Sequence, residues 1–426
     1  MFYNLTTIWS LSCLALGLLI FVIVAWRRLD WGAWLVIALS PLYLLKINHW
    51  PLTVLEGLLW LWLAVWFIKN SRAGNPGVLR EVKNSLSGYS WAALALILGG
   101  LSLGILFSVD WRPGAGILKS WFLAPLGFSL VLGSVFKKDE VKKILSALVV
   151  SAAAVALVAL GYFLTGQLTF DGRLAAFYLS PNHLAMSLAP GFLAALCFLF
   201  LAKQLRQKIL WVVISCLLAA VLYFTYSYGA WLALAVAISF VLFFFWRARL
   251  ISNQTMLWIG LGLIFLLGTI FYWQLGGEKL NNFLSSDRSS WQSRVMVWQA
   301  ASQILKDNWF LGIGPGLFQR YYLDYQRYFP PYLEWAVPQP HNLYFAWWLE
   351  AGLLGLVGWL GLIIEFFRQS FKEWLKTKQP LELILMAVMI YCLLHGLVDT
   401  PFWKNDLALA WWLIVFLGCR AGRRAD

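Results

Sequence analysis

The sequence predicts an all-α polytopic membrane protein with about 12–13 transmembrane helices and one large loop outside the membrane. Of the 426 residues, 61% are hydrophobic and only 12% are charged, and the mean hydropathy is +0.73. Soluble domains carry roughly a quarter charged residues, so this composition excludes a soluble enzyme, a disordered chain and an ordinary nucleic-acid-binding protein. The chain also holds 27 tryptophans, whose rings suit the membrane–water interface.

Thirteen apolar runs, bounded by charged residues or by Gly and Pro, are the expected helices, since a span needs about 20 mostly apolar residues. They cover 8–26, 31–45, 51–68, 91–107, 118–136, 144–164, 183–202, 209–226, 229–246, 256–275, 341–367, 381–399 and 403–419. The run at 31–45 is short, so it and the next run form either two spans or a hairpin around His49–Pro51. No internal repeat or low-complexity linker divides the chain, and we therefore expect one integral membrane domain over 1–426.

The Lys and Arg residues predict the orientation, because the loops richest in them face the cytoplasm. One set of loops carries 22 of the 33, and the opposite short loops carry only five. The basic set lies at 27–28, 69–83, 137–143, 203–208, 247–249, 368–378 and 420–424. We expect these loops and the C-terminus inside, and the N-terminus outside if all 13 spans are real. We therefore attribute the net charge of +14 to contact with anionic membrane lipid rather than to nucleic-acid binding.

The segment 276–340 is the one long connection, and this topology places it on the outer face, where we expect it to carry part of a site. Large apolar side chains recur in it at helical spacing, with charged and polar residues between them: Trp291, Val295, Trp298 and Leu305. This pattern predicts an amphipathic helix on the bilayer surface. A glycine-rich turn, Gly312–Gly316, follows it.

Several familiar catalytic patterns do not occur in the sequence. The five cysteines are dispersed without a CxxC pair, and there is no DxD pair, no P-loop and no cluster with metal-ligand spacing. We therefore expect no metal site and no cofactor. Any chemistry must come from Arg, His, Tyr and a few carboxylates at the outer face.

His341 is the strongest catalytic candidate. It follows Pro340 and opens an apolar helix, which predicts a position in the first helical turn. The positive end of the helix dipole favours the neutral ring, which can accept a proton. The alternative is a boundary histidine bonded to lipid headgroups or to a loop carbonyl.

Arg173 and Arg294 are the strongest basic candidates, because they lie outside the cytoplasmic charge set. A guanidinium binds phosphate oxygens in a bidentate manner, so two of them near one membrane face suit a pyrophosphate ligand. Headgroup contact, or pairing of Arg173 with Asp171, is the alternative. Arg320 and Arg327 lie among tyrosines of the outer loop and are weaker candidates.

Further ionisable residues lie near the predicted outer ends of spans. His395 and Asp399 are four residues apart on one helix face, so they either relay a proton, position His341, or form a structural pair. Glu350 lies about 13 Å along the helix from His341 and is interpreted as a buried partner rather than a catalyst. His183 begins a span and is interpreted as a cap.

Three segments of the sequence resemble the O-antigen ligase/polymerase family. SRVMVWQAASQILKDNWFLGIGPGLFQRYY and PQPHNLYFAWWLEAGLLG carry that family's Arg, the Trp a few residues on, the Gly-x-Gly-x-x-x-Phe turn, His-Asn-x-Tyr and Glu-x-Gly. The upstream GRLAAFYLSPNHLA resembles its Arg-to-Pro-Asn segment. The resemblance implies a glycosyltransferase-C-like membrane fold and a metal-independent glycosyltransferase or ligase.

Such enzymes take a glycan from an undecaprenyl-pyrophosphate carrier at the periplasmic face of the bacterial inner membrane. The acceptor is a lipid-A core, another glycan or a protein, and the sequence does not separate ligase from polymerase or protein glycosyltransferase. Besides the carrier and the acceptor, the expected partners are membrane lipids and not nucleic acid. A transporter or a flippase for lipid-linked glycans is the alternative, although no internal repeat supports it.

The resemblance also assigns roles by position. His341 would be the essential histidine, and Arg173 and Arg294 would lie near the donor pyrophosphate. Tyr228, in TYSYGAWLALA, stands where the family often has Arg, so it would either supply a hydrogen bond or mark a rebuilt phosphate site. The expected supporting residues are Asn182, Arg320, His395 and Asp399.

Overall fold

The computed structural model of the protein describes residues 3–4, 8–46, 52–72, 77–136, 140–275, 290–330 and 335–420. These residues form helices almost throughout, with one pair of two-residue parallel strands, β1 (Tyr3–Asn4) and β2 (Leu45–Lys46). The helices before the middle of the chain are α1 (Ile8–Arg27), α2 (Leu29–Ala38), α3 (Val54–Arg72), α4 (Gly77–Asn84), α5 (Gly88–Leu106), α6 (Trp111–Ile117), α7 (Ala124–Val135), α8 (Val141–Leu164) and α9 (Pro181–Leu201). Those after it are α10 (Leu205–Phe224), α11 (Tyr228–Arg247), α12 (Asn253–Gln274), α14 (Ser290–Asp307), α15 (Phe318–Tyr325), α16 (Leu343–Thr377), α17 (Pro380–His395) and α18 (Asn405–Arg420). Shorter turns are η1 (Ser40–Leu44), η2 (Leu118–Leu123) and η4 (Gln326–Tyr328).

The predicted all-α polytopic membrane fold is confirmed. Within the described ranges, nine helices are long and apolar enough to cross a membrane, and α2, α17 and the first part of α12 are shorter apolar helices. A helix or a short helical series lies at each of the thirteen predicted runs. The run at 31–45 becomes α2 followed by η1, because Pro41 disfavours helical geometry at the residue before it. The proposed hairpin at His49–Pro51 lies outside the described residues.

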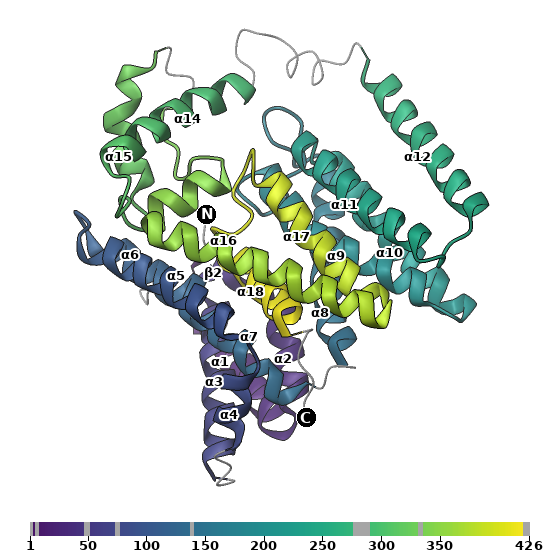
Figure 1. Ribbon diagram of the computed structural model, residues 1–426, viewed down its shortest axis with the longest axis horizontal. Helices are drawn as coiled ribbons and strands as arrows, with labels where there is room; N and C mark the ends of the chain where they lie inside the picture. The colour runs from purple at the N-terminus through teal and green to yellow at the C-terminus, as the bar shows by residue number, and fades with distance from the viewer. Residues whose placement is uncertain are drawn as a thin grey trace.

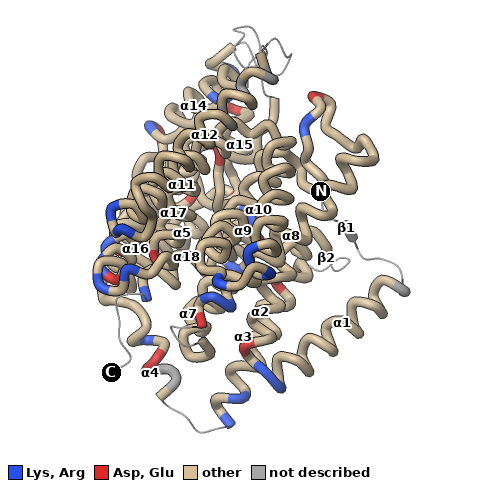
Figure 2. Tube along the Cα trace, turned by 90° about the vertical axis from the view of Figure 1, so that its right-hand side faces the viewer, with Lys and Arg blue, Asp and Glu red and all other residues tan. Residues whose placement is uncertain are grey.

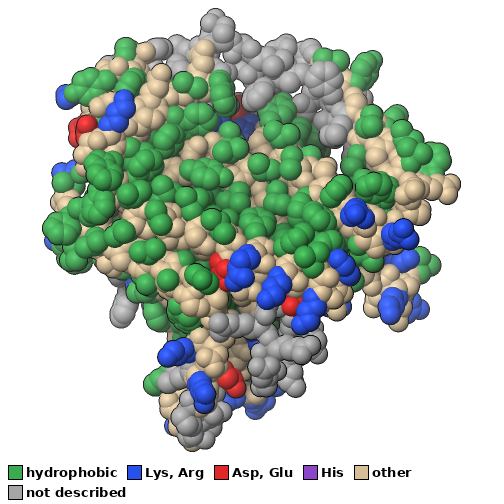
Figure 3. All heavy atoms as spheres, viewed as in Figure 1, with side chains coloured by type: hydrophobic (Ala, Val, Ile, Leu, Met, Phe, Trp, Pro, Cys, Tyr) green, Lys and Arg blue, Asp and Glu red, His purple; other side chains and the backbone are tan. Residues whose placement is uncertain are grey.

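The helices form a bundle with a cap of shorter helices at one end (Figure 1). α16 runs through the bundle alongside α5, α17 packs on α11 and α9, and α14 and α15 pack together above them. Lys and Arg residues concentrate toward the opposite end, from the far end of α16 past α7 to α3 and α4 (Figure 2), and a hydrophobic belt separates the two ends of the face in Figure 3. The candidate residues on α14 and at the start of α16 therefore lie away from the most basic end.

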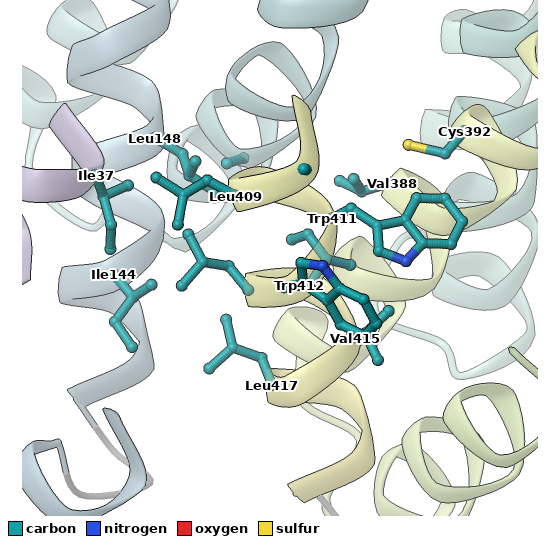
Figure 4. Close-up of a cluster of buried hydrophobic side chains, with 14 of the residues drawn as sticks. Ile37, Ile144, Leu148, Val388, Cys392, Leu409, Trp411, Trp412, Val415 and Leu417 are labelled. Carbon is teal, nitrogen blue, oxygen red and sulfur yellow. The ribbon is translucent and has the colours of Figure 1, made fainter. Parts of the chain in front are cut away.

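α18 lies at the centre of the core and packs on several elements (Figure 4). Its Leu409 points toward Ile37 and Leu148 on one side, and its Trp411 points toward Val388 of α17 on the other. These side chains are nearly inaccessible to solvent. Helices that are apolar all round suit such a buried central position.

Helix α16 is interrupted at Gly352, where the backbone has φ +66° and ψ −174°. The outer glycine-rich turn occupies the interruption: Ile313 N–H donates to Leu349 O at 2.7 Å, and Leu353 N–H donates to Phe310 O at 2.8 Å. A Cβ at Gly352 would lie 2.7 Å from the Phe310 oxygen, so only glycine permits this approach. The backbone groups that a broken helix exposes are thus satisfied by protein, as the membrane interior requires.

α14 confirms the helix predicted within the segment 276–340, and one of its faces packs on the protein. The side chains buried against α15 and α16 are Met296, Val297, Ala300, Ala301, Ile304 and Leu305. Trp291 is half exposed, and Trp298 and Val295 are only partly buried. The small side chains of Ala300 and Ala301 allow close packing on the protein, and the bilayer-facing stripe of Trp291, Val295 and Trp298 stays a prediction.

Candidate functional site

Strained backbone marks the region where the candidate residues meet. Among the described residues, five that are not glycine have positive φ: Ala176, Tyr226, Arg249, His341 and Lys378. Arg249 and Lys378 follow the ends of α11 and α16, where such geometry is common. The other three lie in the loops that carry or adjoin the candidate residues. Strain of this kind persists where the surrounding structure enforces it, often at functional sites.

His341 precedes α16 instead of lying in its first turn, so that prediction was wrong. Asn342 is the N-cap, and its side-chain oxygen accepts from the N–H groups of Tyr344 and Phe345, at 3.0 Å each. Asparagine is among the best N-caps. Asn342 therefore caps the start of the helix, and His341, which the preceding proline had placed in the first turn, lies just before it. His341 has φ +47°, and its side chain is 38% exposed.

The start of α16 is fixed to the end of α17. Leu343 N–H donates to Gly396 O at 2.7 Å, and the Asn342 amide donates to Leu397 O at 3.0 Å. The Trp298 indole N–H of α14 lies 3.4 Å from His341 O. Three elements therefore determine where the imidazole lies.

Asp399, just beyond α17, faces His341. Its Oδ1 lies 3.6 Å from His341 Nδ1 and accepts from Thr400 N–H at 2.8 Å. Burial raises the pKa of Asp399, but the facing imidazole of His341 and the charge of Arg294 outweigh burial and hold the pKa below its usual range. Asp399 is therefore an ionised carboxylate directed at the imidazole.

Arg173 is connected to the carboxylate of Asp399 through the side chain of Asn182. Its Nε donates to Thr225 O at 2.8 Å, and its Nη2 donates to Asn182 Oδ1 at 2.9 Å. Asn182 Nδ2 then donates to Asp399 Oδ2 at 2.8 Å. Asp171 is 3.9 Å from Arg173 Nη1 and is half exposed, so the alternative pairing contributes a weaker contact. The chain Arg173–Asn182–Asp399–His341 joins three loops distant in sequence.

Arg294 and Tyr228 complete the cluster. Arg294 Nε donates to Val398 O at 2.8 Å, next to Asp399. Arg173 lies within electrostatic reach of both Arg294 and Tyr228. Both guanidinium groups thus lie within electrostatic reach of Asp399, which faces the imidazole, and Tyr228 lies within reach of Arg173.

The side chains of His395 and Arg320, two of the expected supporting residues, do not join the hydrogen bonds of this cluster. The ring of His395 is buried, and its Nδ1 lies 2.9 Å from the Tyr391 hydroxyl. Asp399 N–H donates to His395 O at 3.0 Å, and the two side chains are within electrostatic reach without a hydrogen bond between them. Of His395 and Asp399, which could each have positioned His341, only Asp399 faces it. Arg320 and Arg327 are exposed, on α15 and η4.

A second histidine–carboxylate pair, which the sequence analysis missed, lies inside the bundle. His183 Nε2 is 3.4 Å from Asp406 Oδ1 and 3.3 Å from the Tyr43 hydroxyl, and the Tyr178 hydroxyl is 3.4 Å from Asp406 Oδ2. Ser180, not His183, caps α9. The signal available in the sequence was Asp406, a carboxylate within an apolar run.

Two other buried carboxylates have structural partners. Glu350 Oε2 accepts from Gly316 N–H at 3.1 Å, which supports its interpretation as a buried partner. Glu56 pairs with Lys119 at 3.2 Å and accepts from the Asn405 amide at 2.9 Å. Within the described ranges, no group of three His, Cys, Asp or Glu residues has the geometry of a metal site.

Residues 213–360 match the family model described as O-antigen ligase. This match confirms the resemblance to the O-antigen ligase/polymerase family and supports a glycosyltransferase or ligase function of that general type. A search of curated proteins finds no match to the chain. The matched region contains Tyr228, Arg294 and His341, whereas Arg173 and Asp399 join them from outside it.

Proposed function

We propose, starting from the O-antigen ligase domain at residues 213–360, that the protein transfers a glycan from an undecaprenyl-pyrophosphate carrier to a hydroxyl-bearing acceptor. The acceptor is a lipid-A core, another glycan or a protein. The reaction takes place at the outer, periplasmic face of a bacterial inner membrane. The observation that carries the proposal is the hydrogen-bonded chain from Arg173 through Asn182 to Asp399, whose carboxylate faces the partly exposed His341 at 3.6 Å.

His341 acts as the general base. Its Nδ1 faces the ionised Asp399, so Nδ1 retains the proton and Nε2 presents its lone pair to the acceptor hydroxyl. The hydroxyl oxygen attacks the anomeric carbon, its proton passes to Nε2, and the bond from that carbon to the pyrophosphate oxygen breaks. The contact of 3.6 Å is long for a hydrogen bond, as is common in catalytic pairs without substrate.

The arginines bind the leaving group. Arg173 and Arg294 are each held through Nε by a backbone carbonyl, which fixes the plane of the guanidinium. Negative charge grows on the pyrophosphate as it departs, and preorganised cations stabilise that charge more in the transition state than in the ground state. Tyr228 supplies a neutral hydrogen bond at this site.

One observation favours the alternative of a transporter: α16 is a broken helix, a feature that transporters use at their binding sites. Here, however, the interruption is filled by the turn around Ile313, whose backbone pairs with that of Leu349. The break therefore does not line a cavity. The strained and charged groups also gather beyond the helix ends rather than at mid-span, so transfer is the better supported function.

A detergent assay separates the two functions. The purified full-length protein is incubated with the lipid-linked glycan pool extracted from the cells that produce it, together with extracted acceptor lipids. We expect release of undecaprenyl pyrophosphate and a glycan-extended acceptor, both measured by mass spectrometry. Transport needs an intact bilayer, so activity that requires sealed vesicles and releases no pyrophosphate lipid would contradict the proposal.

A further inference from the structure

We propose that Asn182 is a positioning residue that links occupancy of the Arg173 phosphate site to the orientation of the catalytic base. This inference rests on the proposed function, because it concerns how the base is held during transfer. Arg173 and Asp399 are linked through Asn182 and form no direct ion pair with each other. Asn182 is the one side chain in this hydrogen-bonded chain that contacts both the guanidinium and the carboxylate.

The chemistry of the two neighbours determines how the amide is turned. A guanidinium can only donate hydrogen bonds, and an ionised carboxylate can only accept them. The amide between Arg173 and Asp399 must therefore direct its oxygen to the first and its nitrogen to the second, as the distances of 2.9 and 2.8 Å show. No other uncharged side chain of this size presents an acceptor and a donor in that arrangement.

This arrangement determines which carboxylate oxygen meets the histidine. Asn182 holds Oδ2 of Asp399, and Thr400 N–H holds Oδ1 from the backbone side. Oδ1 is thereby directed at His341 Nδ1, which among the described residues has no hydrogen-bond partner within the usual distance. A small rotation of Asp399 would close or open this contact.

Binding of the donor favours the orientation of Asp399 that faces His341. A pyrophosphate bound by Arg173 further restrains the guanidinium that Thr225 O already holds through Nε, and with it the amide of Asn182 and the Asp399 rotamer that faces the imidazole. The site is then most active when the donor is present, and the base is less well oriented when it is absent. Asn182 lies in the first turn of α9, a rigid element well suited to this role.

The substitution Asn182→Asp tests the donor half of the bridge. Aspartate keeps an acceptor for Arg173 and nearly the same volume, but it cannot donate to Asp399 when ionised. Two carboxylates this close share a proton, so the pKa of the pair is raised, and we expect kcat to fall about 10- to 100-fold, the range for outer-shell partners, as the pH is raised and that proton is lost. The KM for the lipid-linked donor should change by less than about threefold, because the arginine keeps its partner.

Asn405→Asp is the matched control. Asn405 also donates to a buried carboxylate, Glu56, at 2.9 Å, while its oxygen accepts from Trp121 at 2.9 Å. The same chemical change there should lower thermal stability and leave kcat per folded molecule unchanged. Equal loss of kcat in both variants would mean that Asn182 has only a structural role.

A double-substitution cycle distinguishes positioning from additive damage. If Asn182 acts through the base, the Asn182→Asp change should have little further effect in a His341→Gln background. Independent, multiplying losses would overturn the proposal, as would near-wild-type kcat for Asn182→Asp alone. If His341→Gln itself keeps full turnover, the base role in the proposed function fails instead, so the two failures are distinguishable.

Discussion

Two histidine–aspartate pairs of nearly equal geometry lie in different surroundings. His341 and Asp399 are 3.6 Å apart, and His183 and Asp406 are 3.4 Å apart. The His341 side chain is 38% exposed, whereas that of His183 is 4% exposed. Guanidinium groups adjoin the first pair, and tyrosine hydroxyls adjoin the second.

The comparison teaches that the pair itself does not identify a site. A histidine beside a carboxylate is equally suited to holding two helices together and to moving a proton. The first pair can meet substrate because its histidine precedes a helix in strained geometry at the bundle end. The second is sealed in the bundle, where α9, α18 and η1 converge.

The largest expected effect is that of His341→Gln on turnover. Glutamine can hydrogen-bond but cannot take up a proton at working pH, so we expect kcat to fall about 10²- to 10⁴-fold. The rate of undecaprenyl pyrophosphate release measures this change. The same substitution at His183 is the control, and comparable losses at both positions would remove the distinction between the two pairs.

Asp399→Asn should have the next largest effect. The amide cannot provide the negative charge that orients and stabilises the protonated imidazole, so we expect kcat to fall about 10- to 100-fold. Steady-state kinetics of the folded protein provide the measurement. Asp406→Asn should leave kcat within about threefold of wild type, and an equal loss there would indicate a general requirement for buried carboxylates.

Arg173→Lys tests whether the charge beside the first pair binds phosphate. Lysine keeps the charge but loses the planar fork, and a charge-assisted hydrogen bond contributes about 1.5–3 kcal/mol. We expect kcat/KM for the donor to fall about 10- to 100-fold, since each 1.4 kcal/mol is a factor of ten. Arg72→Lys, at the end of α3, should have no measurable effect; if the two variants behave alike, Arg173 contributes only to membrane topology.

The smallest effect on activity should come from His183→Gln. The Asp406 carboxylate would lose one partner in a sealed region, which destabilises by about 1–3 kcal/mol. Thermal unfolding in detergent should therefore shift to lower temperature, while kcat per folded molecule stays within about threefold of wild type. Full loss of turnover with unchanged stability would assign the catalytic role to the buried pair.

The sequence predicted the helices much better than it predicted their contacts. Hydropathy placed a helix or a short helical series at each predicted run, because the bilayer imposes a length and a polarity on the segments that cross it. Arg173, Arg294 and His341 were selected from the sequence without knowledge of packing, and the structure places all three within electrostatic reach of Asp399. The chain from Arg173 through Asn182 to Asp399 was not predicted, since it depends on how the loop before α9 meets the end of α17.

The errors in prediction have local physical causes. The position of His341 was wrong because Asn342 is a stronger N-cap than a preceding proline is a helix start. The face of α14 that packs on the protein was not predicted, because the small side chains of Ala300 and Ala301 give no amphipathic signal that distinguishes it. The pairing of His183 with Asp406 joins residues 223 positions apart, and helical periodicity carries no information at that range.

The interruption of α16 at Gly352 separates what can vary in this protein from what cannot. Residues 310–313 bind the helix through main-chain groups, so the contact depends on backbone geometry and not on the identity of the side chains. Insertions between the turn and His341 would leave this joint intact, whereas one extra residue between Phe310 and Ile313 would misalign both of its hydrogen bonds. Homologous chains should therefore differ freely in length after the turn and agree in length within it, even where their side chains have diverged.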